Sequence, residues 1–116
     1  MNSTTAVRTA AIFGFLAVAL GAFGAHGLKG TLELYGTTAI WQTAALYHLV
    51  HSVVLLVLAQ REATPRLSFQ LFAAGIVIFS GSLYLLAVTN VKWLGAITPL
   101  GGLSLLAGWL CVAFRR

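Results

Sequence analysis

The sequence predicts an all-α protein, a four-helix transmembrane bundle in a single integral membrane domain spanning residues 1–116. Four apolar stretches fill most of the 116-residue chain, and a helix of about 20 apolar residues crosses the roughly 30 Å hydrocarbon core of a bilayer. Hydrophobic residues make up 59% of the chain and charged residues 8%, with a mean hydropathy of +0.95. Soluble domains carry about 25% charged residues, so this composition excludes an ordinary water-soluble domain. We expect helices over about residues 9–25, 39–59, 68–88 and 94–114.

The first apolar stretch has small residues three and four positions apart, from Ala10 to Ala25. This spacing lets a second helix approach closely, which is how helices associate in lipid. An alternative is a secretory signal, because Arg8 precedes the run and residues 22–24 form a weak small-x-small cleavage site. We expect a retained helix, since the run is longer than a typical signal core and its removal would leave the two termini on opposite sides.

Glycines interrupt the chain between the first two spans, over Gly27 to Thr38, where we expect a short interfacial turn or helix. Thr37 or Thr38 can cap the second span, because a hydroxyl oxygen accepts a bond from a free amide of the first helical turn. A polar loop over residues 61–66 leads to the third span, for which Ser68 is the expected cap.

The fourth apolar stretch contains Pro99, and proline favours the first turn of a helix. A regular helix is therefore expected to begin at Thr98, with residues 93–97 kinked or non-helical at the membrane surface. Depth alone places Trp41 and Trp93 near one interface and Trp109 near the other, as an aromatic belt would.

The net charge of +5 is spread over the loops and chain ends, without the basic stripe and interleaved aromatics of a nucleic-acid surface. We therefore expect no nucleic-acid partner. Cytoplasmic loops carry an excess of Lys and Arg, and this rule predicts that both termini are cytoplasmic. The inner side then has Arg8, Arg61, Arg66, Arg115 and Arg116, and the outer side Lys29 and Lys92.

The second span contains two histidines near the membrane midplane, His48 and His51, about 60° apart on one helical face, and Tyr47 lies one turn before His51. Ionisable groups are costly at this depth and usually face the bundle interior or a wet cavity. One interpretation is a proton relay or a polar ligand site, and another is ligation of a metal or haem. The interpretation we favour is structural, with each imidazole bonded to a backbone carbonyl, Ser80, Ser82 or Tyr84.

His26 ends the first span between glycines, and we expect it to act as a structural cap or to bond within the outer loop. The spans contain no carboxylate, which removes the usual second partner of a metal-bound histidine. We therefore expect no metal and no cofactor. Ser80 and Ser82 lack the Gly-x-Ser-x-Gly pattern of a catalytic nucleophile, so we expect a protein that is not an enzyme.

Four ordered blocks resemble a known family: Gly21 to Gly27, Trp41 to His51, Phe79 to Tyr84, and Thr98 to Trp109. Over nearly the whole chain they are similar to the small bacterial membrane proteins grouped as domain of unknown function 423, or uncharacterised protein family 0382. The resemblance implies a four-helix protein of the bacterial inner membrane without an established activity, and so it transfers no catalytic residue. It also implies that His26 and His51 match the family's typical histidines, whereas the position of His48 is often glutamine.

The leading hypothesis is a structural or ligand- or partner-binding component of the inner membrane. It would contact lipid and could assemble with a second copy or another membrane protein, because small residues line more faces than four helices need for pairing. A second hypothesis is a minimal channel or transporter subunit, with His48, His51 and Tyr47 lining a polar path. A third is a redox accessory that binds haem or quinone.

Overall fold

The computed structural model describes residues 2–114, and within them it contains helices and no strand. The elements in chain order are α1 (Ser3–Ala25), α2 (Lys29–Tyr35), α3 (Thr38–Ala59), α4 (Arg66–Thr89), the 3-10 helix η1 (Lys92–Ala96) and α5 (Thr98–Ala113). Four segments are long and apolar enough to cross a membrane: Ser3–Ala25, Thr38–Ala59, Arg66–Thr89 and Lys92–Ala113. The all-α class and the four membrane spans are confirmed.

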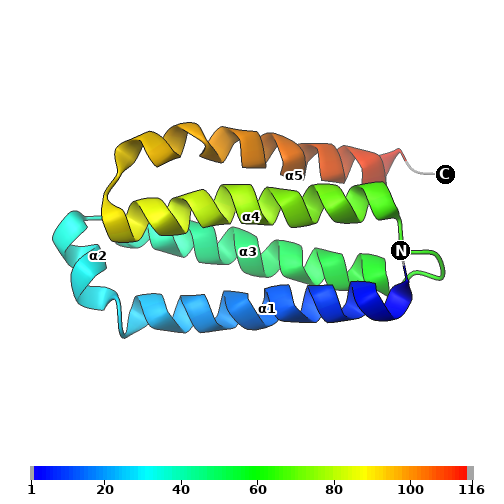
Figure 1. Cartoon of the computed structure of the whole chain (residues 1–116), viewed down its shortest axis with the longest axis horizontal. Coiled ribbons are helices and arrows are strands. Elements are labelled where there is room, and N and C mark those ends of the chain that lie inside the picture. Colours follow the sequence, from blue (N-terminus) through cyan, green and yellow to red (C-terminus); the bar gives the residue numbers. More distant parts are fainter. Residues whose placement is uncertain (1, 115–116) are drawn as a thin grey trace.

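The four long helices lie nearly parallel to one another (Figure 1). The start of α1 and the end of α5 lie at one end of the molecule, while α2 and η1 lie at the other. Each long helix packs on its neighbour in the chain: α1 on α3, α3 on α4, and α4 on α5. Within the described residues, α1 and α5 have no Cα atoms within 8 Å of each other, so the bundle is an open row with α1 and α5 at its edges.

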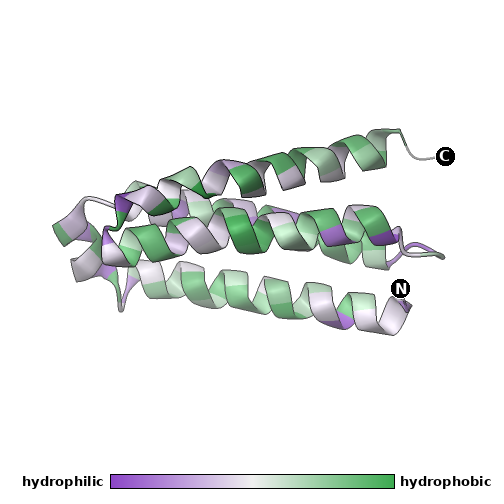
Figure 2. Ribbon diagram, turned by 45° about the horizontal axis from the view of Figure 1, so that its top comes forward, coloured by the Kyte–Doolittle hydropathy of each residue, from purple (hydrophilic) through white to green (hydrophobic). Residues whose placement is uncertain are grey.

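Hydrophobic residues occupy most of the middle of the long helices, whereas hydrophilic residues concentrate toward the ends (Figure 2). Many large ones face outward; Phe15, for example, is 72% exposed and Val18 is 65% exposed. Such a surface is stable in contact with lipid and would be unfavourable in water. The core toward the chain ends is made of Ala6, Ala10, Leu55, Leu58, Ala59, Phe69, Phe72, Ile76 and Leu105, and a smaller one under α2 of Leu32, Trp41 and Ala87.

α1 begins six residues before the expected start, because the polar segment before Thr9 continues the helix. The side chain of Asn2 caps it, accepting a bond of 2.7 Å from the backbone N–H of Thr4. The hydroxyl of Ser3 donates to the carbonyl of Ala59 at 3.2 Å, which joins the start of α1 to the end of α3.

Two expected helix caps are not formed. Thr37 precedes α3, but its hydroxyl donates to the carbonyl of Ala87 on α4 at 2.7 Å instead of capping its own helix. α4 begins at Arg66 directly after Pro65, so Ser68 lies inside the first turn and is buried. The kink before the last helix is present as η1, and Pro99 sits in the first turn of α5 as expected.

Small residues bring α4 and α5 into close contact. A Cβ added at Gly101 would meet the backbone of Phe79, and one at Gly75 would meet Leu105. The hydroxyl of Ser104 donates to the carbonyl of Leu71 across the same interface at 2.7 Å. The small residues of α5 are therefore used for packing against α4. On α1, by contrast, an added Cβ at Gly21 would meet nothing within 4 Å.

Candidate functional site

The middle of α3 carries the polar side chains that the sequence singles out. No Gly or Pro interrupts this helix, and the hydroxyl of Ser52 donates to the carbonyl of His48 one turn earlier at 2.7 Å. His48 and His51 are 4% and 6% exposed, whereas Tyr47 is 42% exposed on the outer surface of the row. Burial of two imidazoles in an apolar bundle calls for hydrogen-bond partners, and each finds a different set.

His48 bonds to α4. Its Nδ1 atom lies 2.9 Å from the hydroxyl oxygen of Tyr84, and its ring forms a T-shaped pair with that of Phe13 on α1 at a centroid distance of 6.3 Å. The Tyr84 ring also lies against Trp41, with centroids 4.6 Å apart. The Nε2 atom of His48 is buried and has no hydrogen-bond partner among the described residues. This imidazole therefore links α3 to α4 through one nitrogen.

His51 is bonded through both nitrogens. Its Nδ1 lies 2.8 Å from the carbonyl oxygen of Tyr47, and the indole Nε1 of Trp109 on α5 donates to its Nε2 at 3.1 Å. A carbonyl only accepts and an indole N–H only donates, so Nδ1 carries the proton and Nε2 accepts. This pair of bonds fixes a neutral imidazole in a single tautomer. The rings of Phe72 and Tyr47 lie at centroid distances of 5.8 and 6.0 Å.

The two histidines do not share a site. His48 lines a groove of about 190 Å³ between α1 and α4, whereas His51 lines a groove of about 520 Å³ between α3 and α5. The first groove is bordered by Phe13, Leu16, Leu20, Ile76, Val77, Ser80, Gly81 and Tyr84. The second is bordered by Tyr47, Phe79, Pro99, Gly102, Leu103, Leu105, Leu106 and Trp109. Each groove is apolar apart from its histidine and one or two hydroxyls.

The expected serine partners bond elsewhere. The hydroxyl of Ser80 donates to the carbonyl of Ala44 at 2.8 Å, which ties α4 to α3. Ser82 shares a hydroxyl pair with Thr98 at 2.6 Å, which ties α4 to the start of α5. Of the three predicted partners on α4, only Tyr84 bonds to a histidine.

His26 lies apart from the other two, at the end of α1 beside α2. Its backbone N–H donates to the carbonyls of Ala22 and Phe23, and its side chain is exposed. Residue 26 therefore closes the helix through its backbone, and its imidazole is not brought near the midplane pair. Within residues 2–114 there is no group of three or more His, Cys, Asp or Glu side chains close enough to share a metal ion.

Two important residues were not expected from the sequence. Trp109 was assigned to an interfacial belt, but it donates to His51 in the bundle. Trp41 was assigned to the opposite belt, but it is 4% exposed and donates to the carbonyl of Leu20 at 2.9 Å. Trp93, at 67% exposed, and Trp109, at 45% exposed, keep the outward-facing surface of a belt residue, whereas Trp41 does not. An indole N–H can only donate a hydrogen bond, so a tryptophan within a span needs an acceptor on a neighbouring helix. That requirement is the sequence signal that could have identified the inward bonds of Trp41 and Trp109.

Comparison with known proteins gives one consistent family. The sequence model of the family described as "Protein of unknown function (DUF423)" matches residues 20–102. The chain is 44% identical over 109 residues to UPF0382 membrane protein YwdK of Bacillus subtilis, covering 88% of this chain and 87% of the relative. It is 43% identical over 114 residues to UPF0382 inner membrane protein YgdD of Escherichia coli, covering 94% and 86%. No solved structure matches.

Proposed function

This chain belongs to the DUF423 family of membrane proteins, and from that premise we propose that it is a structural, ligand- or partner-binding component of the membrane without catalytic activity. Its buried polar side chains join the helices, and its outward surface meets lipid and partners. The hydrogen bonds between helices that support this proposal involve Thr37, Ser80, Ser82, Ser104, His48 and His51.

The single observation that carries the proposal is the bonding of His51. A relay histidine must take up and release a proton, and a haem or metal ligand must present a nitrogen lone pair. The Nε2 lone pair of His51 accepts from Trp109, and its Nδ1 proton is donated to the carbonyl of Tyr47. Either function would break a bond that joins α3 to α5 or a bond within α3. The separate grooves of His48 and His51 also favour two packing roles over one polar path.

The proposed location is the bacterial inner membrane, as in the name of the E. coli relative, with both chain ends in the cytoplasm. Supporting this orientation, Arg8 lies early in α1, and Arg61 and Arg66 flank the loop at the same end of the bundle. Lys29 and Lys92 lie at the opposite end, on α2 and η1. Arg115 and Arg116 fall outside the described residues. The excess of cations at the α1–α5 end is what the positive-inside rule requires of a cytoplasmic face.

The test is His51→Ala, with Trp109→Phe as a second variant that removes only the indole donor. Hydrogen bonds between membrane helices contribute about 0.6 kcal/mol on average and up to about 1.7. We expect Trp109→Phe to lower the free energy of unfolding in detergent by about 0.5–1.7 kcal/mol. We expect His51→Ala to lower it by about 1–3 kcal/mol, because it also leaves a cavity beside Phe72. His26→Ala is the matched control, since that imidazole is exposed.

Proton flux into liposomes separates the structural role from a relay. We expect the reconstituted wild-type protein and His51→Ala to give the same flux as empty liposomes. Flux above that background, abolished by His51→Ala while the variant unfolds at the wild-type midpoint, would refute the structural role.

A further inference from the structure

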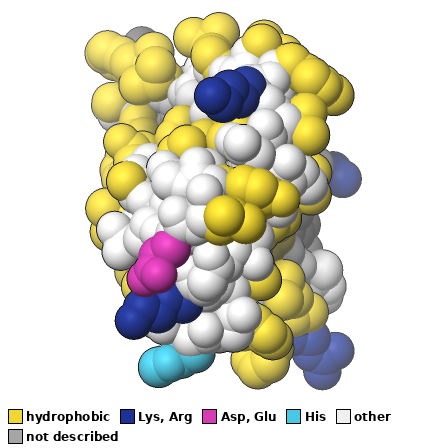
Figure 3. All heavy atoms as spheres, turned by 90° about the vertical axis from the view of Figure 1, so that its left-hand side faces the viewer, with side chains coloured by type: hydrophobic (Ala, Val, Ile, Leu, Met, Phe, Trp, Pro, Cys, Tyr) yellow, Lys and Arg dark blue, Asp and Glu magenta, His cyan; other side chains and the backbone are white. Residues whose placement is uncertain are grey.

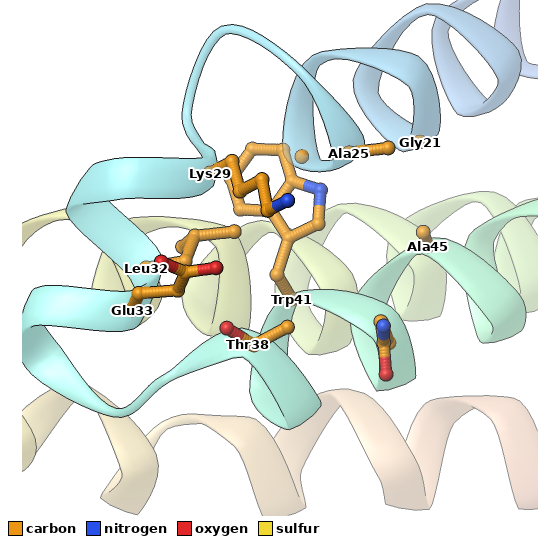
Figure 4. A pocket seen from close by; sticks show the side chains of 10 residues that line it. Gly21, Ala25, Lys29, Leu32, Glu33, Thr38, Trp41 and Ala45 are labelled. Atoms are coloured by element: carbon orange, nitrogen blue, oxygen red, sulfur yellow. The ribbon is translucent and has the colours of Figure 1, made fainter.

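A pocket of about 240 Å³ lies at the α2 end of the bundle, away from all three histidines. Three helices contribute to it: Gly21, Gly24 and Ala25 from α1, Lys29, Leu32 and Glu33 from α2, and Thr38, Trp41, Gln42 and Ala45 from α3. Figure 4 shows Lys29, Glu33 and Thr38 arranged around the indole of Trp41. We call this cavity the outer pocket.

The wall formed by α2 is fixed in place. Leu32 is 1% exposed and packs in the small core under α2. Gly36 ends the helix in a left-handed conformation with φ of 67°, which glycine adopts without strain. Thr37 then donates its hydroxyl proton to the carbonyl of Ala87 on α4. The short helix is thus anchored at its centre and just beyond its end, so that its polar side chains have a defined position above α1 and α3.

The floor of the outer pocket depends on two glycines of α1. A Cβ at Gly24 would collide with the indole of Trp41, so the absence of a side chain there allows Trp41 to lie against α1. In this position its N–H donates to the carbonyl of Leu20. A Cβ at Gly21 would meet nothing within 4 Å although Gly21 lines the pocket, so the space beside it is unfilled. Helix packing explains Gly24 but not Gly21.

Four polar side chains face this space in two pairs, each pair one helical turn apart on its own helix. Lys29 and Glu33 come from α2, and Thr38 and Gln42 from α3. Within residues 2–114 none of these four side chains forms a hydrogen bond or an ion pair. Figure 3 views this end of the molecule and shows the acidic side chain close to a basic one. The outer pocket therefore offers one positive charge, one negative charge and neutral hydrogen-bond donors and acceptors, and none of these groups has a partner within the described residues.

We propose that the outer pocket binds the headgroup of a zwitterionic phospholipid that has a primary amine. The ammonium of Lys29 can donate up to three hydrogen bonds to phosphate oxygens. The carboxylate of Glu33 accepts from the lipid's primary ammonium, a bond that a quaternary ammonium cannot donate. Thr38 and Gln42 are placed to meet the glycerol and ester oxygens. The opposite charges of one headgroup thus match the opposite charges of one pocket.

The depth of the outer pocket favours a lipid over a free solute. Thr38 begins α3 and Ala45 is seven residues further on, so the pocket reaches about 10 Å from the start of that span toward the membrane centre. One turn deeper on the same helical faces lie Val18, three residues before Gly21 on α1, and Leu49, four residues after Ala45 on α3. Val18 is 65% exposed and Leu49 is 43% exposed. An acyl chain leaving the pocket would therefore meet an apolar surface.

The test is lipid retention by the purified full-length chain in mild detergent, counted by native mass spectrometry. The probes are phospholipids with identical acyl chains and ethanolamine, choline or glycerol headgroups. We expect wild type to retain the ethanolamine lipid several-fold more than the other two. Exposed charge pairs are typically worth about 0.2–1 kcal/mol, so Lys29→Ala and Glu33→Ala should each lower retention by a factor of about 1.4 to 5. Gly21→Leu should abolish it by filling the pocket.

Two matched variants act as controls. Lys92→Ala removes an exposed cation at the same end of the bundle but outside the outer pocket. Gly81→Leu adds the same side chain at another helical glycine with no neighbour within 4 Å. Both should retain the ethanolamine lipid as wild type does. Thermal unfolding of Gly21→Leu at or above the wild-type midpoint would show that its loss of lipid is not a loss of fold.

Three results would overturn the proposal: equal retention of all three headgroups, unchanged retention by Gly21→Leu, or displacement of the lipid by an equal concentration of glycerophosphoethanolamine. The last result would mean that the pocket serves a soluble amine phosphate. None of the histidines lines the outer pocket, so each of these failures is separate from the outcome of the His51→Ala experiment.

Discussion

Substitution of Gly101 by Ala tests the close packing of α4 against α5. A Cβ added at this position would lie 2.7 Å from the Cα of Phe79 and 2.9 Å from the carbonyl carbon of Ile78. Ordinary van der Waals contact begins at 3.4 Å, and a Cβ essentially never lies closer than 3.0 Å to another heavy atom. The colliding atoms belong to a helix backbone, which cannot turn aside as a side-chain end can. The two helices must therefore separate by most of an ångström.

The separation has a cost that can be estimated. A gap of about 0.5–1 Å forfeits a quarter to a half of the dispersion energy of the atoms beside it. It also stretches the bond from the Ser104 hydroxyl to the carbonyl of Leu71, worth about 0.6 kcal/mol for an average bond between membrane helices. Overpacking of a tight core usually costs about 1–3 kcal/mol. We expect Gly101→Ala to lower the free energy of unfolding by that amount relative to its control.

Gly102→Ala is the control, because it makes the same change in the adjacent residue of the same helix. Its added Cβ would lie 3.8 Å from the nearest atom, Cδ2 of Phe79, which is an ordinary contact. Both variants gain about 1 kcal/mol of helix propensity, so the difference between them isolates the collision. The assay is reversible unfolding in detergent, followed by circular dichroism. Equal unfolding midpoints for the two variants would refute the backbone contact and with it the described spacing of α4 and α5.

Two further predictions concern the α2 end. Thr37→Val removes the hydroxyl bond to α4 while keeping the shape of the side chain, and amides of α2 should exchange with deuterium about two- to tenfold faster; unchanged exchange would mean that this bond does not anchor α2. Gly24→Ala should displace the indole of Trp41 from its position against α1. In a background in which Trp93 and Trp109 are replaced by Phe, the fluorescence emission of Trp41 should then shift to the red and be quenched more strongly. An unshifted spectrum would contradict that contact.

The membrane spans are the part of the fold that sequence predicts best. An uninterrupted apolar run must be hidden from water, and a run of about 20 residues leaves few other solutions. The start of α1 was missed because its first turns are polar: Ser3, Thr4 and Arg8 are exposed at the end of the bundle, where hydropathy gives no signal. The cap by Asn2 is the local cue that extends the helix.

The candidate site was predicted only in part. A spacing of three residues puts His48 and His51 on one face of α3, which indicated a shared site. In the structure α4 lies next to α3 and α5 lies beyond α4, so side chains on one face of α3 can reach either of these helices. A rotation of about 60° is then enough to bond one imidazole to α4 and the other to α5. Which helix each imidazole bonds to depends on the order in which the helices pack, and the spacing of residues within one helix does not reveal that order.

The tryptophans show the same limit. Each tryptophan lies toward one end of its span, as the sequence predicts, but the direction of each indole depends on other helices. Trp41 turns inward because Gly24 on α1 leaves room for it. The indole N–H of Trp109 points to α3 because His51 presents a lone pair there, while 45% of the residue stays exposed. Neither partner is close to its tryptophan in the sequence, so these pairings become visible only in the three-dimensional structure.

The open row has a consequence for how the protein is made. Every interface between long helices joins spans that leave the ribosome one after the other, and contacts of this kind form quickly because little chain must be closed into loops. Each new span can dock on the preceding one as it enters the bilayer, without waiting for a later one to complete it. The bond from Trp109 to His51 is the exception, because it skips over α4. It can form only after the last span is inserted. This bond would therefore be the last contact between long helices to form, after each span has packed on the one before it.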